Sequence, residues 1–202
     1  MDDELKFNPK AYYYEKKVDK YSDTNAYYDL ISLLNDKIEI VSSTVIGNDE
    51  SLKIGVTSYS SSIKHNGKPN YANNSSQKKD VKTLYYKQFI GEHKTKLELH
   101  FYKNNLFFYC YTFSHLKEND KEEIIKILEQ KYFNSGSLDV QNNYLKDLNN
   151  IHISFIDNID FTINYFDPKS EIFEMISKDL QKGKGKIFQK EKNNSKMLYK
   201  RL

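Results

Sequence analysis

Three consecutive stretches between residues 81 and 113 carry β-strand periodicity, and they constrain the fold more than any other feature. Residues 81–90 predict a strand that ends at Gly91, residues 97–102 alternate apolar and polar side chains, and residues 106–113 are apolar on both faces. Alternation is typical of a half-buried strand, and a short continuous apolar run is typical of a fully buried one. The pattern therefore predicts a sheet with residues 106–113 near its centre.

The dipeptide 104–105, Asn-Asn, predicts a two-residue turn between the last two of these strands, because Asn tolerates positive φ. A turn at this place pairs Phe101 with Phe108 and Leu99 with Cys110. Pairing in that register puts the four side chains on one buried face.

Apolar residues at three- and four-residue spacing predict helices over residues 22–36, 119–133 and 168–180. Ser22 or Thr24 can cap the first helix, Asn119 the second and Asp167 the third. The expected buried stripes are Ile124, Ile127, Leu128 and Tyr132 in the second helix, and Ile172, Phe173, Ile176 and Leu180 in the third.

Two further hairpins are expected. Residues 37–46 and 52–59 have β-type composition on either side of the turn signal at 47–50. Residues 151–155 and 161–165 alternate in phase, and their apolar faces coincide only if the intervening loop, 157–159, has an odd length.

These elements predict an α+β fold, a mostly antiparallel sheet with about three helices packed on one face, in the order α-ββ-βββ-α-ββ-α. Residues 1–181 form the expected single domain. It includes an aromatic-rich arm at 1–21 and a flexible polar loop at 60–79, and a Lys-rich C-terminal tail follows at 182–202.

The positive net charge of the chain comes from this tail. Residues 182–202 hold eight basic residues and one acidic residue, a net charge of +7. The whole chain carries +3, so residues 1–181 carry −4. The tail is open to three interpretations: a solvated charge run, a site for nucleic acid or another polyanion, or a segment that docks on an acidic protein surface. Its candidate binding residues are Lys184, Lys186, Lys190, Lys192, Lys196, Lys200 and Arg201.

Arg201 is the only arginine in the chain. Arginine supplies the planar, bidentate fork that reads guanine and grips phosphate, and lysine does not reproduce it. The composition therefore argues against sequence-specific DNA recognition. The Lys, Asn and Ile bias is typical of an AT-rich genome.

Cys110 is the only cysteine, so no intramolecular disulfide can form. The first residues are acidic rather than basic and apolar, and the longest apolar run, 106–113, is too short to span a bilayer. We therefore expect a cytoplasmic protein without a membrane partner.

Candidate catalytic groups are few and scattered. Cys110 with His100 or His115 as base is a conceivable nucleophilic pair, but its apolar strand predicts a packed, inert thiol. No histidine spacing matches a metal site. The five histidines are His65, His93, His100, His115 and His152.

Two acidic patterns have simpler explanations than metal binding. Glu92-His93-Lys94, with Asp80 upstream, has the acid-x-Lys spacing of metal-dependent nucleases, but the chain contains six such triplets. A second candidate cation site is Asp157, Asp160 and Asp167, of which the first is predicted as a turn residue and the last as a helix cap. No catalytic site, metal or cofactor is therefore expected.

The leading functional hypothesis is a non-catalytic protein that binds another protein, such as an inhibitor or immunity-type factor of an AT-rich bacterium. The 17 tyrosines suit an interface if they are exposed, and an acidic body suits a basic partner. The first alternative is a sequence-nonspecific nucleic-acid binder that uses the tail, with Tyr85 and Tyr86 as stacking surfaces. The second is an enzyme whose site is assembled only by folding.

Overall fold

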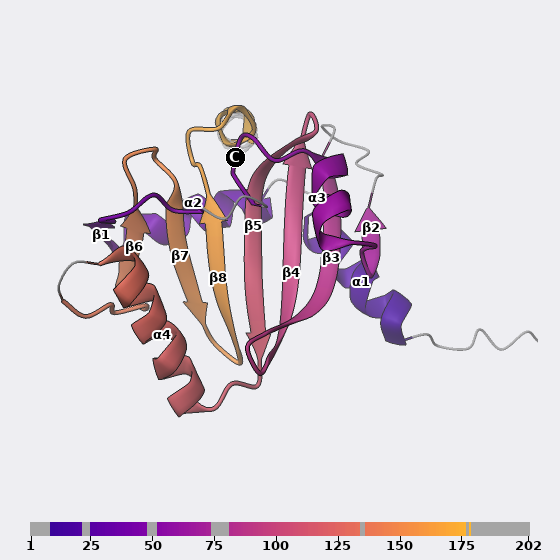
Figure 1. The fold of residues 1–202 in the computed structure, drawn as a ribbon. Helices are drawn as coiled ribbons and strands as arrows, with labels where there is room; N and C mark the ends of the chain where they lie inside the picture. The colour runs from indigo at the N-terminus through magenta and orange to yellow at the C-terminus, as the bar shows by residue number, and fades with distance from the viewer. Residues whose placement is uncertain are drawn as a thin grey trace, which may run out of the picture.

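An eight-stranded sheet in the order β1-β6-β7-β8-β5-β4-β3-β2 organises the described residues of the chain (Figure 1). The computed structural model describes residues 9–21, 25–47, 52–73, 81–133, 136–176 and 178. β1 pairs parallel with β6, and every other strand pair is antiparallel. The α+β class and the mostly antiparallel sheet predicted from the sequence are thus confirmed.

The sheet consists of two antiparallel meanders joined side by side through β5 and β8. The first meander is β2 (Tyr71–Asn73), β3 (Val81–Ile90), β4 (His93–Tyr102) and β5 (Asn105–Ser114). The second is β6 (Asn143–Lys146), β7 (His152–Asp157) and β8 (Asp160–Phe166), with β1 (Ile38–Val41) added at its edge. β5 lies in the interior of the sheet, as its two apolar faces predicted.

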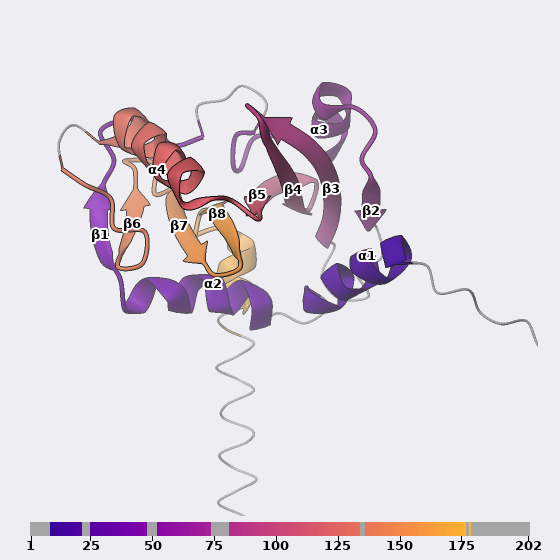
Figure 2. The ribbon, with the colours of Figure 1, turned by 90° about the horizontal axis from the view of Figure 1, so that it is seen from below.

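Helices cover both faces of the sheet, whereas one face was expected (Figure 2). α1 (Pro9–Lys20) and α2 (Asn25–Asn35) lie on one face, and α4 (Glu118–Tyr132) lies on the other, with α3 (Tyr59–Asn66) on the same side as α4. A short helix at residues 171–176 packs with α2 through a shared apolar cluster. Each face therefore has a core of its own.

The turn between β4 and β5 lies one residue earlier than predicted. Lys103 and Asn104 have φ values of 47° and 73°, and a bulge follows between His100 and Phe101. The predicted pairs are therefore wrong: Leu99 pairs with Tyr109 and Glu98 with Cys110. Because a one-residue slip moves a side chain to the other face, Cys110 shares its face with Glu98 and not with Leu99.

The hairpin expected from residues 37–46 and 52–59 does not form. β1 is short and pairs with β6 instead, and the chain turns inward at Ile46 and Leu52, which are both 3% exposed. Gly47 has φ +68°, and a Cβ there would lie 3.3 Å from the Tyr109 hydroxyl. Gly47 therefore permits a close approach to the sheet rather than a hairpin.

The polar segment expected as the flexible loop 60–79 contains regular structure over 60–73. The Ser58 hydroxyl accepts a hydrogen bond from the Ser61 N–H at 3.1 Å, and the Ser61 hydroxyl accepts one from the Ser58 N–H at 3.0 Å. This reciprocal capping box starts α3, so the serine run begins a helix rather than a loop. Residues 74–80 lie outside the described residues.

The last two predicted helices form with adjusted ends. α4 begins at Glu118 with Lys117 as N-cap, so the predicted cap at Asn119 is wrong. Leu128 and Tyr132 are buried as expected, but Ile127 is 53% exposed. In the last helix Ile172, Phe173 and Ile176 are buried, and Asp167 accepts a hydrogen bond from the Lys169 N–H at 2.8 Å. Leu180 and the predicted cap residues Ser22 and Thr24 lie outside the described residues.

β7 and β8 meet in the predicted phase. Ile153 pairs with Tyr165 and Phe155 with Ile163, and three residues, 158–160, lie between the terminal pair Asp157 and Phe161. The odd loop length is confirmed, one residue later than expected.

The arm expected at residues 1–21 is the helix α1 over residues 9–20, and residues 1–8 lie outside the description. None of the helices described is long and apolar enough to cross a membrane.

Candidate functional site

The five histidines do not converge on one site. His65 on α3 and His115 after β5 are exposed, and His93 is half-buried at the start of β4. His100 and His152 are both buried but belong to different strands, β4 and β7. No group of three or more His, Cys, Asp or Glu side chains in the described ranges is arranged to hold a metal ion.

Cys110 is a packed, unreactive thiol, as predicted. It is 3% exposed on β5, opposite Glu98 on β4. Burial, followed by the nearby Glu98 carboxylate, raises the pKa of the Cys110 thiol well above its ordinary value. The thiolate needed for nucleophilic chemistry is therefore disfavoured.

Each of the three candidate aspartates interacts with a different side chain. Asp157 pairs with Lys121 at 3.1 Å, and Asp160 pairs with Lys96 at 3.8 Å. Asp167 accepts a hydrogen bond from the Asn150 side chain at 3.0 Å. Glu92 lies in the β3–β4 turn, as predicted, and Asp80 lies outside the described residues, as do all seven candidate residues of the tail.

The tyrosines are core residues rather than an exposed interface. Of those whose side chains the structure describes, all are buried or half-buried. Tyr85 and Tyr86 are 4% and 5% exposed, so the predicted stacking surface for bases is wrong. Their rings stabilise the interior, where aromatic side chains bury large areas.

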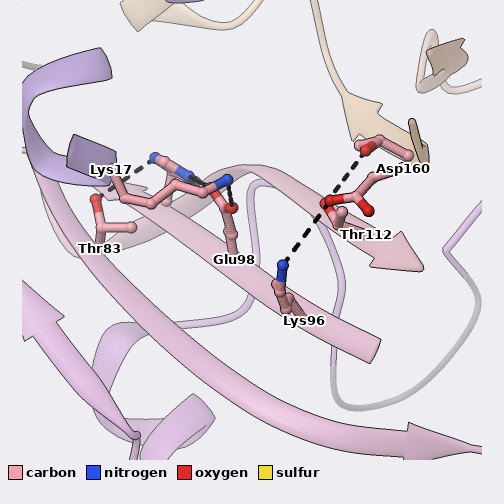
Figure 3. A network of polar contacts seen from close by, with 8 residues as sticks. Lys17, Thr83, Lys96, Glu98, Thr112 and Asp160 are labelled. Atoms are coloured by element: carbon pink, nitrogen blue, oxygen red, sulfur yellow. Dashed lines mark hydrogen bonds and ion pairs between the residues drawn. The ribbon is translucent and has the colours of Figure 1, made fainter. Parts of the chain in front are cut away.

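Folding does assemble one polar network, between α1, α2 and the sheet. The Lys17 ammonium lies 2.6 Å from Glu98 Oε1, and the other carboxylate oxygen lies 3.8 Å from His100 Nε2 (Figure 3). His100 Nδ1 lies 2.9 Å from the Tyr27 hydroxyl and 3.5 Å from the Thr83 hydroxyl. The order Lys17, Glu98, His100, Tyr27 thus connects α1 through β4 to α2.

The protonation states follow from burial and from neighbouring charges. Burial would raise the pKa of Glu98, but His100 and Lys17 outweigh it and lower the pKa to about 2. Burial lowers the pKa of the His100 imidazole, and the neighbouring Glu98 carboxylate opposes this shift. His100 Nδ1 faces the Tyr27 hydroxyl, and His100 Nε2 faces the Glu98 carboxylate.

The side chains at the centre of this network are buried. Glu98 and His100 are 1% and 0% exposed, and Tyr27 is 2% exposed under α2. The network joins α1 and α2 to the sheet. Because α1 was not predicted as a helix, the burial of Glu98 beneath it was not predictable from the sequence of β4 alone.

One accessible feature of the fold is the outer edge of β1. Ile38 is 66% exposed and Val41 is 65% exposed, on the last strand of the sheet. The N–H groups of Ile38 and Ser42 donate to Asn142 and Lys146 on the β6 side, at 2.7 and 2.8 Å. Since backbone groups alternate along a strand, those of Glu39 and Val41 face away from the sheet.

The opposite edge of the sheet is protected. β2 is three residues long, and Tyr14 of α1 stacks on its Tyr71 with ring centroids 4.7 Å apart. Lys68 and Pro69 precede it. Short strands, lysine, proline and covering helices are the usual protections of a sheet edge. β1 is also short and follows Lys37, but no helix among the described residues covers its outer side, and its Ile38 and Val41 side chains stay exposed.

Three acidic and two basic side chains lie around β1. Asp36 is exposed just before the strand, and Glu39 accepts hydrogen bonds from the Tyr144 hydroxyl at 2.8 Å and from Lys146 at 3.1 Å. Burial lowers the pKa of Lys37, and the nearby exposed Asp139 opposes this shift. An edge of this kind can bind an extended, apolar segment with basic residues.

Comparison with known protein families, curated proteins and solved structures gives no match.

Proposed function

We propose that the protein is a non-catalytic binding protein whose β1 edge accepts an extended strand of a partner protein. The observation that carries the proposal is the bare edge, where Ile38 and Val41 are both about two-thirds exposed beside outward-facing backbone groups. Strand addition of this type gains affinity from main-chain hydrogen bonds and specificity from alternate side chains.

The expected partner segment is apolar and basic. Asp36 and Glu39 flank the exposed apolar side chains, and residues 1–181 as a whole carry −4. Complementary charge accelerates association and fixes the register of the added strand. An inhibitor or immunity-type factor of an AT-rich bacterium, acting in the cytoplasm, fits these properties.

The test compares two doubly substituted full-length proteins in a capture experiment from the source cell. Ile38→Lys with Val41→Lys places charge on the β1 edge. Phe89→Lys with Ile159→Lys is the matched control, because these side chains are 65% and 88% exposed on β3 and in the β7–β8 turn, away from that edge. The edge variant should weaken partner binding about tenfold or more, and the control should not.

A photo-crosslinker at position 41 then identifies what lies on the edge. Crosslinks from position 41 to an extended segment of the partner, and none from position 159, are the expected result. Equal loss of binding in both variants contradicts strand addition. So does light scattering that shows a β1-dependent dimer of this chain, since the edge is then used for self-association.

A second candidate function, binding of a nucleic acid, has support from three lysines of α1, β3 and β4 that surround Tyr13. The ammonium groups of Lys17, Lys87 and Lys96 lie 5.9, 5.7 and 5.2 Å from the centroid of the Tyr13 ring. Burial raises the pKa of Tyr13 to about 12, so the ring stays uncharged beside the three cations. Clustered lysines attract phosphates without regard to sequence.

This candidate is tested by fluorescence anisotropy with labelled single-stranded DNA. Substituting Lys87 and Lys96 by Gln should weaken binding, and substituting the seven basic residues at 184–201 by Gln should weaken it further. Affinity should fall steeply with salt in the wild type. Binding that neither set of substitutions changes contradicts this function.

A further inference from the structure

A cleft opens at one end of the sheet, next to the starts of β5 and β7. Its volume is about 480 Å³, within the roughly 300–1,000 Å³ typical of small-molecule sites. Segments far apart in the sequence form its walls: residues 45–47, 53–56, 102–107, 149–151 and 167–172. The cleft is separate from the Lys17–Glu98 network and from the outward side of β1.

The floor of the cleft is apolar. Ile46, Leu106, Phe107 and Ile172 line it and are each 3% exposed or less. Two further apolar side chains stand on its rim, Val45 at 45% and Val56 at 71% exposure. Apolar side chains at both the floor and the rim favour a ligand with an apolar body.

Hydrogen bonds fix the chain segments on two sides of the cleft. The Gly55 N–H donates to Leu106 O at 2.7 Å, and the Leu106 N–H donates to Thr57 O at 2.9 Å, so the 53–57 turn is fixed to β5. On the opposite side, Asp147 accepts from the N–H groups of Ile46 and Ile151, each at 2.8 Å. A cleft with pinned walls persists without a ligand and loses little freedom on binding.

The charges at the cleft are balanced. Its lining includes two cations, Lys53 and Lys103, and two anions, Asp167 and Glu171. Lys103 and Glu171 form an ion pair at 2.6 Å with both side chains more than half exposed, so they lie at the rim. Equal numbers of opposite charges give no net attraction for an anion or a cation.

We infer that this cleft binds a compact, uncharged and largely apolar small molecule. The apolar floor supplies the binding free energy, and the polar rim groups orient whatever single polar group the ligand carries. This inference does not depend on the β1 edge.

Fluorescence titration of the full chain tests the inference with two matched probes. N-phenyl-naphthylamine is uncharged, and anilinonaphthalene sulfonate has a closely similar aromatic body with one negative charge. The uncharged probe should bind saturably, one per chain, and the sulfonate should bind no more tightly. If the uncharged probe does not saturate, the inference is overturned. If the sulfonate binds about tenfold more tightly than the uncharged probe, the ligand is not of the uncharged class.

Substitutions at the rim locate the bound probe. Val56→Trp and Asn149→Trp introduce bulk at lining positions that are already exposed. Leu148→Trp is the control, because it is the neighbour of Asn149 and does not line the cleft. Both lining variants should raise the dissociation constant about tenfold while the control leaves it unchanged. An equal effect of Leu148→Trp places the probe elsewhere and overturns the assignment.

The Ile38→Lys, Val41→Lys protein separates the two proposals. Its affinity for the uncharged probe should equal that of the wild type, whether or not it still binds a protein partner. Loss of probe binding in this variant, with the fold intact by circular dichroism, contradicts the cleft as the site.

Discussion

The two faces of the sheet differ in chemistry although the same strands supply both. The face under α4 is apolar and aromatic, and the face under α1 and α2 is polar across its centre. Buried residues on the first face include Leu84, Leu97, Leu99, Tyr109, Leu145, Ile153, Phe155 and Ile163; those on the second include Thr83, Glu98, His100, Cys110, Ser154, Asn164 and His152.

The difference shows two ways to cover a sheet. The apolar face is covered by side chains that fill the space above it, such as Leu128 and Tyr132 of α4. The polar face needs complementary groups, because a buried charge without a partner is costly. Lys17 of α1 and Tyr27 of α2 supply them at 2.6 and 2.9 Å. We therefore expect the two faces to respond differently to substitution.

Leu99→Ala should have the largest effect. Leu99 is 0% exposed on the apolar face, and the cavity left by its truncation should lower the free energy of unfolding by about 4 kcal/mol. Ser154→Ala, at 0% exposure on the polar face, removes only the weak hydrogen bond from Asn164 and should cost about 1 kcal/mol. Urea denaturation followed by circular dichroism measures both, and equal losses would contradict the comparison.

Lys17→Met should cost about 3 kcal/mol, because it leaves the Glu98 carboxylate buried without its cation. Adding Glu98→Leu to this variant should restore most of the loss, since an apolar pair of similar size tolerates burial. The same urea titrations give the double-mutant cycle. Simple additivity of the two single losses would mean that the pair is not coupled.

His152→Phe should change the pH dependence of stability. Burial, and then Lys146, lower the pKa of His152 from 6.5 to about 4, so the folded protein keeps the ring neutral. The unfolded chain takes up the proton first as the pH falls from 6.5, so this part of the stability is present above 6.5 and lost towards 4. The variant should lack this decline, of about 2 kcal/mol after allowance for screening.

Urea titrations between pH 7 and 4 measure the effect, with the exposed His65→Asn as control. The Glu98 contribution belongs to a lower window, because its pKa is lowered from 4.5 to about 2 and its stabilisation is lost only as the pH falls between those values. If the free energy of unfolding of His152→Phe still declines as the pH falls below 6.5, another group, such as His100, causes the decline.

Ile127→Lys should have the smallest effect. Ile127 is 53% exposed although its neighbour Leu128, in the same predicted stripe, is 6% exposed. Substitution at the exposed position should change the free energy of unfolding by about 0.5 kcal/mol or less. Leu128→Ala should cost several times more, as judged by thermal denaturation. A large loss in Ile127→Lys would mean that α4 buries a wider face.

Periodicity and turn chemistry predicted the helices at 25–35 and 118–132 and the phase of β7 and β8, because these patterns depend on residues close in sequence. The turn at Lys103 and Asn104 shifts the pairing of β4 and β5 by two residues from the predicted register, and the bulge between His100 and Phe101 shifts it back by one. The bulge, which has no sequence signal as clear as the turn, is therefore what moves side chains to the other face. α1 was missed because its contacts are with the sheet: Tyr14 stacks on Tyr71, and Lys17 pairs with Glu98 across 81 positions.

The candidate sites were less predictable than the strands. β1 was expected in a hairpin, and its partner β6 lies more than a hundred positions away, so its exposure as a sheet edge follows only from strand order. The cleft likewise joins five separate segments of the chain. No spacing within one segment signals such a surface.

By itself, the sequence determined that β3, β4, β5, β7 and β8 are strands, that β5 is central and that Cys110 is packed and inert, since alternation, apolar runs and turn residues act locally. It did not predict β2 or β6 as strands. The tertiary structure alone decided which face each side chain occupies, which strand is left at the edge and which polar groups meet in the interior. The physical reason is that burial and pairing are properties of neighbours in space, and strand order and helix docking choose those neighbours.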